Sequence, residues 1–331
     1  MRFVPRLRLA EWLVLAWVGF IAAVHTLAHG WQRVRALDPS AVYVPMFLLL
    51  LLILCQSLLQ VLLAAVRNIA VAVGALQAGP GVAVPPSFTV DWREEMAIVR
   101  SLGGFLRDCA PLFLVVLFYP STDFLNETLQ GGFLADPWLA RIDLLVFRSH
   151  WSVWMERFAS PGLTDWLSLC YFLHLVIPTV ILIYLRLRAP RRLFVEAVQG
   201  FVLILLVGFA LYLAVPAIGP KYELAPLYAR DLAGGWMGTF NRVVIDMTRV
   251  PRDAFPSLHV GLSALLLVYA WRGSRWFAAL VSPFIVGNWV ATIYLRYHYT
   301  IDVVAGFLLV PAVLYTVSWW ERRFAEAAPG G

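Results

Sequence analysis

Long apolar stretches, separated by short polar or arginine-containing segments, run along most of this 331-residue chain. A transmembrane helix needs roughly 20 predominantly apolar residues. The pattern predicts eight such helices, the third of them short, and therefore an all-α, polytopic membrane bundle. Their expected bounds are 10–30, 44–66, 109–120, 166–185, 194–216, 258–271, 276–295 and 303–320.

The connections between these expected helices alternate in charge. Segments 186–192 and 272–275 contain arginines and no acidic residue, and the chain after Trp320 begins Glu-Arg-Arg. Two expected spans separate each of these segments from the next, so all three fall on one side, which the positive-inside rule identifies as cytoplasmic. We expect both termini on that side and a bacterial plasma membrane as the location. The connections expected to face the periplasm or exterior are the loops 121–165, 217–257 and 296–302.

The composition supports a membrane protein and excludes other classes. Hydrophobic residues make up 61% of the chain, charged residues 14%, and the mean hydropathy is +0.77. Soluble domains carry about 25% charged residues. The net charge of +6 comes from scattered arginines and a single lysine, which suits membrane orientation rather than nucleic-acid binding. The three cysteines lack metal-ligand spacing, so neither a metal site nor a disulfide framework is expected.

Segment 77–108 interrupts the apolar pattern. It starts with a Gly/Pro-rich stretch, AGPGVAVPP, and continues through several charged residues. We interpret it as a linker followed by a short interfacial helix. The predicted division of the chain is an N-terminal transmembrane helical pair at 1–76, the linker and interfacial helix at 77–108, the main bundle at 109–320 and a cytoplasmic tail at 321–331.

Polar residues concentrate at the expected outward ends of the last spans. Polar groups in membrane helices are costly, which makes them functional candidates. His298 and Asp302 are four residues apart and share one face if that turn is helical. An aspartate that accepts a proton from one imidazole nitrogen leaves the other nitrogen as a nucleophile. Alternatively, Asp302 caps the last span and His298 is an interfacial residue.

The second polar segment precedes the sixth expected span. Pro256 suits the opening turn of a helix, and Asp253 or Ser257 can cap that opening. His259 then lies in the first turn, where free N–H groups and the positive end of the helix dipole favour a phosphate. His259 there could protonate a leaving oxygen. The alternative is a buried histidine whose partners are backbone groups.

The other four histidines, His25, His29, His150 and His174, have no comparable surroundings in the sequence. His25 and His29 share a helical face and could bind a metal, but such a pair is more often a packing feature. Together, the two polar segments supply what a phosphate ester requires, namely cations, a nucleophile and a proton donor.

These residues resemble two motifs of the type-2 phosphatidic acid phosphatase superfamily. Pro256 to His259 is similar to its Pro-Ser-X-His motif, and His298 to Asp302 to its His-X-X-X-Asp motif. Phe255 to His259 and Tyr294 to Asp302 resemble the inositol phosphorylceramide synthase branch more closely, and sphingomyelin synthases are also similar. The resemblance covers about 105–320, and it includes the upstream run that begins at Asp143.

The resemblance implies a six-helix catalytic core, here with about two additional N-terminal transmembrane helices. It also implies a phosphohistidine intermediate formed without a metal or other cofactor. By this resemblance, His298 is the nucleophile, Asp302 its partner and His259 the acid.

The chain departs from the superfamily pattern where the phosphate is bound. The arginine six residues before the third-motif histidine is Thr292 here, and the first motif has no clear match. Other cations must therefore bind the phosphate, unless they are surface residues that face lipid headgroups. The candidate substrate-binding residues are Arg249, Arg296, Arg252, Lys221 and Ser257.

Three functions are compatible with this pattern. The first is transfer of a phosphate or phospho-headgroup from a phospholipid or other lipid phosphate to a lipid or polyol alcohol at the outer membrane face. The second is a lipid phosphate phosphatase, acting on phosphatidic acid or a polyprenyl phosphate, with water as the acceptor. The third is a non-catalytic lipid transporter or scaffold. The headgroup, the acceptor and the oligomeric state are not indicated by the sequence.

Overall fold

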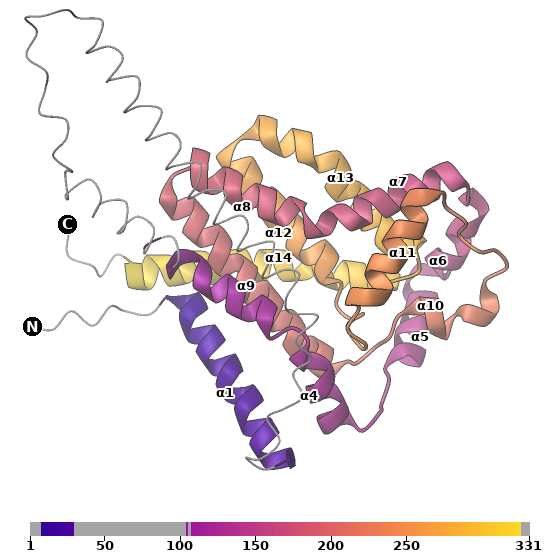
Figure 1. Cartoon of the computed structure of the whole chain (residues 1–331), viewed down its shortest axis with the longest axis horizontal. Helices are drawn as coiled ribbons and strands as arrows, with labels where there is room; N and C mark the ends of the chain where they lie inside the picture. The colour runs from indigo at the N-terminus through magenta and orange to yellow at the C-terminus, as the bar shows by residue number, and fades with distance from the viewer. Residues whose placement is uncertain (1–7, 30–103, 105–106, 326–331) are drawn as a thin grey trace, which may run out of the picture. The chain divides into compact units, whose positions relative to one another are not determined.

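The computed structural model describes residues 8–29, 104 and 107–325, and every regular element in these residues is a helix (Figure 1). The prediction of an all-α chain is therefore confirmed. The chain divides into two compact units, one formed by 1–37 with 118–331 and the other by 38–117. In the second unit the described part is a helix from Arg107 to Leu117, close to the span expected at 109–120. The span expected at 44–66 and most of segment 77–108 lie outside the described residues.

The remaining predicted spans are present in the first unit. The span expected at 166–185 consists of two helices that meet at a bend of 49°, with a short 3-10 turn, η3 (Leu173–Leu175), between them. Pro178 stands in the first turn of the second helix, where proline is tolerated because the N–H there has no partner within the helix. The long helices are α1 (Leu9–His29), α7 (Pro161–Phe172), α8 (Ile177–Arg188), α9 (Arg191–Ala214), α12 (Leu258–Gly273), α13 (Arg275–Tyr294) and α14 (Thr300–Trp320).

Three helices of the described chain are long and apolar enough to cross a membrane by themselves, namely those at Arg191–Ala214, Arg275–Tyr294 and Thr300–Phe324. The number rises to five if each of two bent helix pairs counts as one span. By length and composition, this is an integral membrane protein.

The two long connections that we expected to be loops contain helices instead. Their mixture of apolar and polar residues gives no uninterrupted apolar stretch, so a search for membrane spans does not detect them. These elements are α4 (Ser121–Gln130), α5 (Asp136–Phe147), α6 (Trp151–Trp154), η2 (Met155–Phe158), α10 (Pro220–Glu223), η4 (Ala225–Leu227) and α11 (Trp236–Thr248).

Helix α12 is central to the bundle because it packs against α8, α9, α13 and α14. Its contact with α14 is close: a Cβ atom at Gly261 would lie 3.0 Å from the carbonyl oxygen of Gly306. Its first turn also presses on α9, where Leu258 fills the space beside Gly208. This packing fixes the start of α12 relative to the start of α14.

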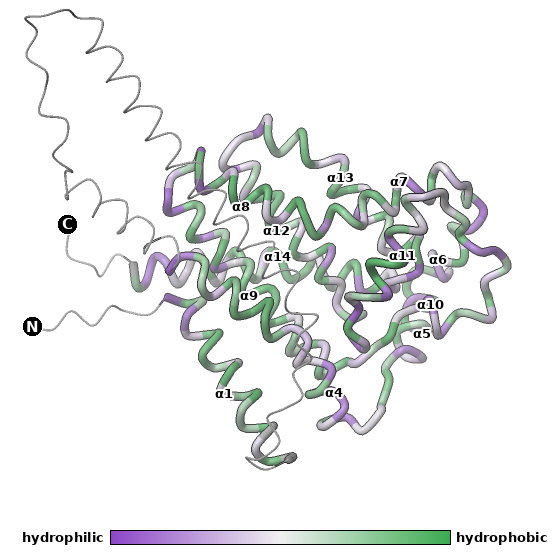
Figure 2. The backbone as a smooth tube through the Cα atoms, viewed as in Figure 1, coloured by the Kyte–Doolittle hydropathy of each residue, from purple (hydrophilic) through white to green (hydrophobic). Residues whose placement is uncertain are grey.

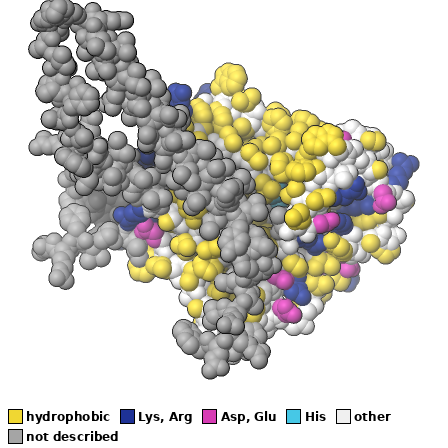
Figure 3. All heavy atoms as spheres, in the orientation of Figure 1, with side chains coloured by type: hydrophobic (Ala, Val, Ile, Leu, Met, Phe, Trp, Pro, Cys, Tyr) yellow, Lys and Arg dark blue, Asp and Glu magenta, His cyan; other side chains and the backbone are white. Residues whose placement is uncertain are grey.

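The arginine-rich connections lie together at one end of the bundle (Figure 1). A Cβ atom at Gly273, in the last turn of α12, would lie 2.7 Å from Leu185 near the end of α8. The end of α14 joins the same region, because Gln199 donates a hydrogen bond of 2.6 Å to Glu321. Figure 2 shows the long helices hydrophobic over most of their length, and Figure 3 shows charged side chains gathered over the region of α5, α10 and α11. The connections that contain α5, α10 and α11 therefore lie at the end opposite the arginine-rich ones.

Candidate active site

The two histidines singled out by the sequence meet at the end of the bundle opposite the arginine-rich connections. His298 lies in the turn between α13 and α14, and His259 lies in the first turn of α12. Nε2 of His298 is 3.1 Å from Nδ1 of His259. The His298 side chain is only 2% exposed. The fold therefore brings together two motifs that are 39 residues apart in the chain.

The second nitrogen of His298 has two oxygen neighbours. Nδ1 lies 2.7 Å from the carbonyl oxygen of Ala254 and 3.5 Å from Oδ2 of Asp302. A carbonyl can only accept, so Nδ1 carries the hydrogen and the lone pair of Nε2 points at His259. Burial lowers the pKa of His298 to about 4 and the charge of Arg249 adds to this effect, although Asp253 and the Ala254 carbonyl oppose it. The imidazole is therefore neutral and nucleophilic at pH 7.

Asp302 combines the two alternatives that the sequence allowed, a helix cap and a neighbour of His298. Its Oδ2 accepts the backbone N–H of Tyr299 at 2.8 Å and so satisfies a donor at the start of α14. The same oxygen is the one near His298. The carboxylate is fully buried, and Oδ1 has no hydrogen-bond partner among the described residues. Asp302 therefore caps α14 and also places a carboxyl group beside the imidazole.

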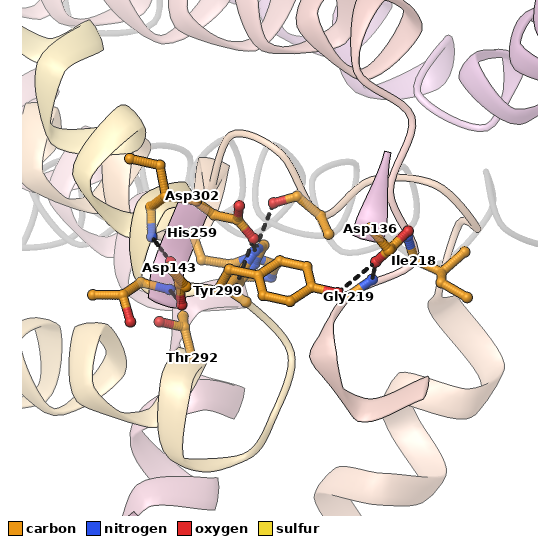
Figure 4. Close-up of polar contacts among 12 residues, drawn as sticks. Asp136, Asp143, Ile218, Gly219, His259, Thr292, Tyr299 and Asp302 are labelled. Atoms are coloured by element: carbon orange, nitrogen blue, oxygen red, sulfur yellow. Dashed lines mark hydrogen bonds and ion pairs between the residues drawn. The ribbon is translucent and has the colours of Figure 1, made fainter. Parts of the chain in front are cut away.

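Helix α5 supplies two further buried carboxylates that hold the site's loops (Figure 4). Asp143 accepts the backbone N–H groups of Thr300 and Ile301, both at 2.9 Å, and burial raises its pKa. Asp136 accepts two N–H groups from the turn after α9, at Ile218 and Gly219, and the hydroxyl of Tyr299. Asp136 could not be recognised from the sequence, because all of its partners lie more than 80 residues away in the chain.

The ring of His259 is oriented by the bent helix pair α7–α8. The hydroxyl of Tyr171 lies 3.0 Å from Nε2 of His259. The backbone carbonyl of His259 also accepts hydrogen bonds from Ser263 at 2.6 Å and Asn288 at 3.3 Å. His174, which in sequence had no comparable surroundings, packs against the same ring with 4.3 Å between centroids. His174 therefore lies against the histidine pair, a position that its surroundings in the sequence did not indicate.

The hydrogen-bond directions follow from the fixed donor at His298. Since Nε2 of His298 is the acceptor, Nδ1 of His259 must carry the hydrogen that lies between the two rings. Nε2 of His259 is then an acceptor, and the Tyr171 hydroxyl donates to it. The chain of donors from Tyr171 through His259 to His298 thus presents a proton beside a nucleophile.

The start of α12 differs from the expected capping arrangement. Ser257 is the residue before the helix, but its side chain makes no capping hydrogen bond, and its buried Oγ has no partner among the described residues. Its backbone N–H instead donates to the carbonyl of Asp302 at 3.0 Å. Asp253 does not cap either, because the Tyr119 hydroxyl donates to its carboxylate, whose pKa is raised by burial.

Arg249 is the candidate cation whose charge acts on the histidine pair. Its guanidinium donates to the carbonyl of Ile218 at 2.6 Å and stacks over the Tyr222 ring at 4.4 Å. Its charge also lowers the pKa of His298, as described above. Because the side chain has no carboxylate partner among the described ion pairs, its charge is available to a phosphate.

Two of the other candidate cations, Arg296 and Arg252, pair with carboxylates, and the charge of the third, Lys221, lies near an aromatic ring. Arg296 forms a largely buried ion pair with Glu156 at 2.6 Å, and its guanidinium stacks over Tyr228 at 3.8 Å. Arg252 pairs with Asp123 on α4 at 3.0 Å. The Lys221 ammonium lies 5.7 Å from the centre of the neighbouring Tyr222 ring. Of the four, Arg249 is therefore the best placed to bind a phosphate at the histidine pair.

Comparison with known proteins identifies the family. The model of the PAP2 superfamily matches residues 137–316, which is more than half of the chain and contains both histidine motifs. This chain belongs to the PAP2 superfamily.

A curated relative of this PAP2 protein is similar to the inositol phosphorylceramide synthase branch suggested by its motifs. The phosphoinositol dihydroceramide synthase of Bacteroides thetaiotaomicron is 29% identical over 171 residues. The match covers 47% of this chain and 53% of the relative, so the chain spans about half the length of the protein it matches. No solved structure matches the chain.

Proposed function

We propose that this integral membrane protein is a lipid phosphotransferase that moves a phosphate or phospho-headgroup from a lipid to an alcohol through a phosphohistidine intermediate. The observation that carries the proposal is the contact between Nε2 of His298 and Nδ1 of His259 at 3.1 Å. One ring offers a lone pair and the other a proton, at the same point in a buried site. Phosphoryl transfer requires both groups at one phosphorus atom.

In the first step, Nε2 of His298 attacks phosphorus in line with the leaving oxygen. The N–P bond forms as the P–O bond to the leaving alcohol breaks. His259 takes up a proton at Nε2 when the anionic phosphate binds, so its Nδ1–H can protonate the leaving oxygen and the ring becomes a neutral imidazole. Asp302 and the Ala254 carbonyl stabilise the positive charge that develops on the imidazole through Nδ1–H. General acid catalysis of this kind contributes about 10²–10⁴-fold.

In the second step, an acceptor alcohol attacks the phosphohistidine. His259, now a neutral imidazole with hydrogen on Nε2 and a lone pair on Nδ1, takes the proton of the hydroxyl as the new P–O bond forms and the N–P bond breaks. This returns both histidines to their starting protonation states. Arg249 stabilises the negative charge on the phosphoryl oxygens in both steps, which is the main form of protein assistance in phosphoryl transfer.

The reaction as written uses only side chains, and we propose that it needs no metal ion. Activity should then be undiminished in EDTA. A loss of activity in EDTA that added magnesium restores would contradict this part of the proposal while leaving the histidine roles open to the variants below.

The name of the relative suggests the first substrates to test, phosphatidylinositol as the donor and dihydroceramide as the acceptor. The purified protein is incubated in detergent with phosphatidylinositol labelled in the headgroup, with and without dihydroceramide. We expect labelled phosphoinositol to move to the acceptor in the wild type, and no labelled product with His298→Ala. Turnover by His298→Ala at the wild-type rate would exclude the phosphohistidine route.

A parallel assay separates the alternative functions. Release of inorganic phosphate from phosphatidic acid or a polyprenyl phosphate without an acceptor, dependent on His298, indicates a phosphatase that uses water. If no donor lipid is turned over, the lipids of cells with and without the protein are compared. Unchanged lipid chemistry with an altered distribution between leaflets would favour a transporter or scaffold.

We also propose that the site faces the periplasm or exterior of a bacterial plasma membrane, and that the chain divides into an N-terminal pair at 1–76, a linker at 77–108, a core at 109–320 and a tail at 321–331. The arginine-rich connections at one end of the bundle support this orientation. A reporter fused after Gly331 should be cytoplasmic. An extracytoplasmic reporter would reverse the orientation.

A further inference from the structure

Helix α11, in the connection between α9 and α12, presents three different faces. One face is buried and includes Met237 and Asn241. The second carries four exposed apolar side chains, Trp236, Phe240, Val243 and Met247, which are 77%, 43%, 52% and 78% exposed. Their spacing of four, three and four residues makes one continuous stripe along the helix. The third face carries exposed polar residues, namely Thr239, Arg242 and Asp246.

The buried face attaches α11 to α7, which belongs to the bent spanning pair. Gly235 precedes α11 and has no side chain to cap it. Asp165 on α7 takes over this function, because its Oδ1 accepts the N–H of Gly238 at 2.8 Å. A Cβ atom at Gly235 would lie 2.6 Å from the same carboxylate, so glycine permits the close approach. The first turn of α11 is therefore anchored to a membrane-spanning element.

The apolar stripe is continuous with the apolar surface of that spanning pair. The Phe240 ring contacts Phe172, at the end of α7, with 5.2 Å between centroids. Leu175 and Val176 follow in the chain and are exposed on the same pair of helices. Exposed apolar side chains on a membrane-spanning segment face lipid acyl chains. The stripe extends this lipid-facing surface onto α11.

The polar face borders the candidate active site, because Ile245, next to Asp246 in the chain, packs with Tyr297 against a buried cluster that includes Tyr171. Arg242 and Asp246 both act on the Tyr297 hydroxyl, whose pKa is raised mainly by burial. Tyr297 precedes His298 and packs against Tyr171 with 4.6 Å between ring centroids. At its other end α11 leads directly into Arg249, the cation assigned to the phosphate. Figure 1 shows α11 running across the direction of α14.

We propose that α11 is a membrane-embedded border of the active site, with its apolar stripe in the acyl-chain region of the adjoining leaflet and its polar face toward the site. The ligand of the stripe is lipid hydrocarbon. Large apolar side chains on one face and charged side chains on another are the features of helices that lie in a membrane interface. This inference depends on the membrane-spanning nature of the bundle and not on the reaction assigned to the histidines.

Spin-label accessibility in lipid nanodiscs tests the proposal on the full chain. Cys55, Cys109 and Cys170 are first replaced by alanine. Each variant then receives one new cysteine, at a position from one of two sets, and this cysteine is spin-labelled. Collision rates with oxygen, which concentrates in hydrocarbon, and with a water-soluble nickel complex are then compared. The apolar set is Phe240, Val243 and Met247, and the matched polar set is Thr239, Arg242 and Asp246.

We expect oxygen to collide preferentially at the apolar set and the nickel complex at the polar set, so that the preference alternates along α11. Leu308, exposed on the spanning helix α14, is the reference for lipid contact. Preferential nickel access at the apolar set would mean that the stripe faces water. Exclusion of both probes there would mean that protein covers it, whether residues 30–103 or a second copy. Either result overturns the proposal.

A second measurement uses the wild-type chain and so does not depend on the cysteine-free background. A phospholipid with a diazirine in the acyl chain is photoactivated in the nanodisc, and adducts are mapped by mass spectrometry. The proposal predicts adducts on Trp236, Phe240 or Met247. Adducts on exposed α14 residues but none on α11 would contradict it.

Discussion

Gly306 on α14 lies directly against the backbone carbonyl of Ser257 at the start of α12. A Cβ atom at position 306 would come 2.4 Å from that oxygen and 3.2 Å from the backbone nitrogen of Gly261. Ser257 stands two residues before His259, and Gly306 follows Asp302 by one helical turn. The absence of a side chain at Gly306 therefore sets the distance between the helices that carry the candidate acid and the nucleophile's partner.

Gly306→Ala should force α12 and α14 apart, because both clashing atoms belong to the backbone and cannot move aside by rotation. A misplacement of about 1 Å can lower a reaction rate on the order of 10²-fold, and we expect a loss of that order in lipid turnover by the folded variant. The measurement is turnover of labelled phosphatidylinositol, with the unfolding midpoint in detergent determined in parallel. Gly162→Ala is the matched control, because a Cβ atom there meets nothing within 4 Å. Wild-type turnover by Gly306→Ala would show that this contact does not set the site geometry.

Tyr171→Phe should lower kcat without changing KM. The Tyr171 hydroxyl donates to Nε2 of His259 and keeps the proton of that imidazole on Nδ1, beside His298. Without it, both tautomers are accessible before the substrate binds, and Nε2–H of the protonated ring has no acceptor while Nδ1–H protonates the leaving oxygen. The loss of one hydrogen bond of about 0.5–1.5 kcal/mol corresponds to roughly a 2- to 10-fold decrease.

Steady-state kinetics on the same lipid pair checks this prediction. Tyr297→Phe is the control, because Tyr297 packs against the Tyr171 ring but its hydroxyl makes no hydrogen bond among the described residues. Equal losses in both variants would assign the effect to packing rather than to the tautomer of His259.

Replacing Arg249 and Arg296 one at a time should distinguish a cation that binds the phosphate from one that stabilises the fold. Arg249→Ala removes the charge that acts on His298, and we expect kcat/KM to fall about 10²–10³-fold, as when a transition-state donor is removed. Arg296→Ala instead leaves Glu156 buried without its partner. Breaking such a pair destabilises a protein by about 3–5 kcal/mol, so the unfolding midpoint should fall while the folded fraction keeps its activity. The reverse assignment of these two phenotypes would place the phosphate at Arg296.

The comparison of sequence with structure shows why some site residues could be predicted and others could not. His298 and Asp302 are separated by one helical turn, and His259 follows a proline that starts a helix, so local spacing made them candidates and the resemblance to the superfamily motifs suggested their roles. The apolar lengths likewise predicted α9, α12, α13 and α14 within a few residues. These features depend on contacts between near neighbours in the chain.

The site residues that the sequence did not predict depend on contacts between distant segments. Tyr171 lies 88 residues before His259, and Ala254 lies 44 residues before His298. The break between α7 and α8 that brings His174 to the site occurs inside an apolar stretch that predicts one continuous span. The only local signal was Tyr171 and His174 three residues apart in that stretch, two polar rings that a lipid-facing helix would not require.

The pH dependence of the reaction should follow the lowered pKa of His298. Burial disfavours its protonated form and places the pKa at about 4, so the nucleophile stays neutral well below the usual value of 6.5. With a phosphodiester lipid as the donor, which does not itself titrate in this range, kcat/KM should decline toward half its plateau only as the pH approaches 4. Stability responds earlier, because between pH 6.5 and 4 the unfolded chain binds a proton that folded His298 does not, so the free energy of unfolding decreases as the pH falls. Initial rates from pH 3.5 to 8, restricted to conditions where the protein is still folded, test the prediction. An acid limb centred near 6.5 in folded protein would mean that His298 is not the buried, neutral nucleophile described here.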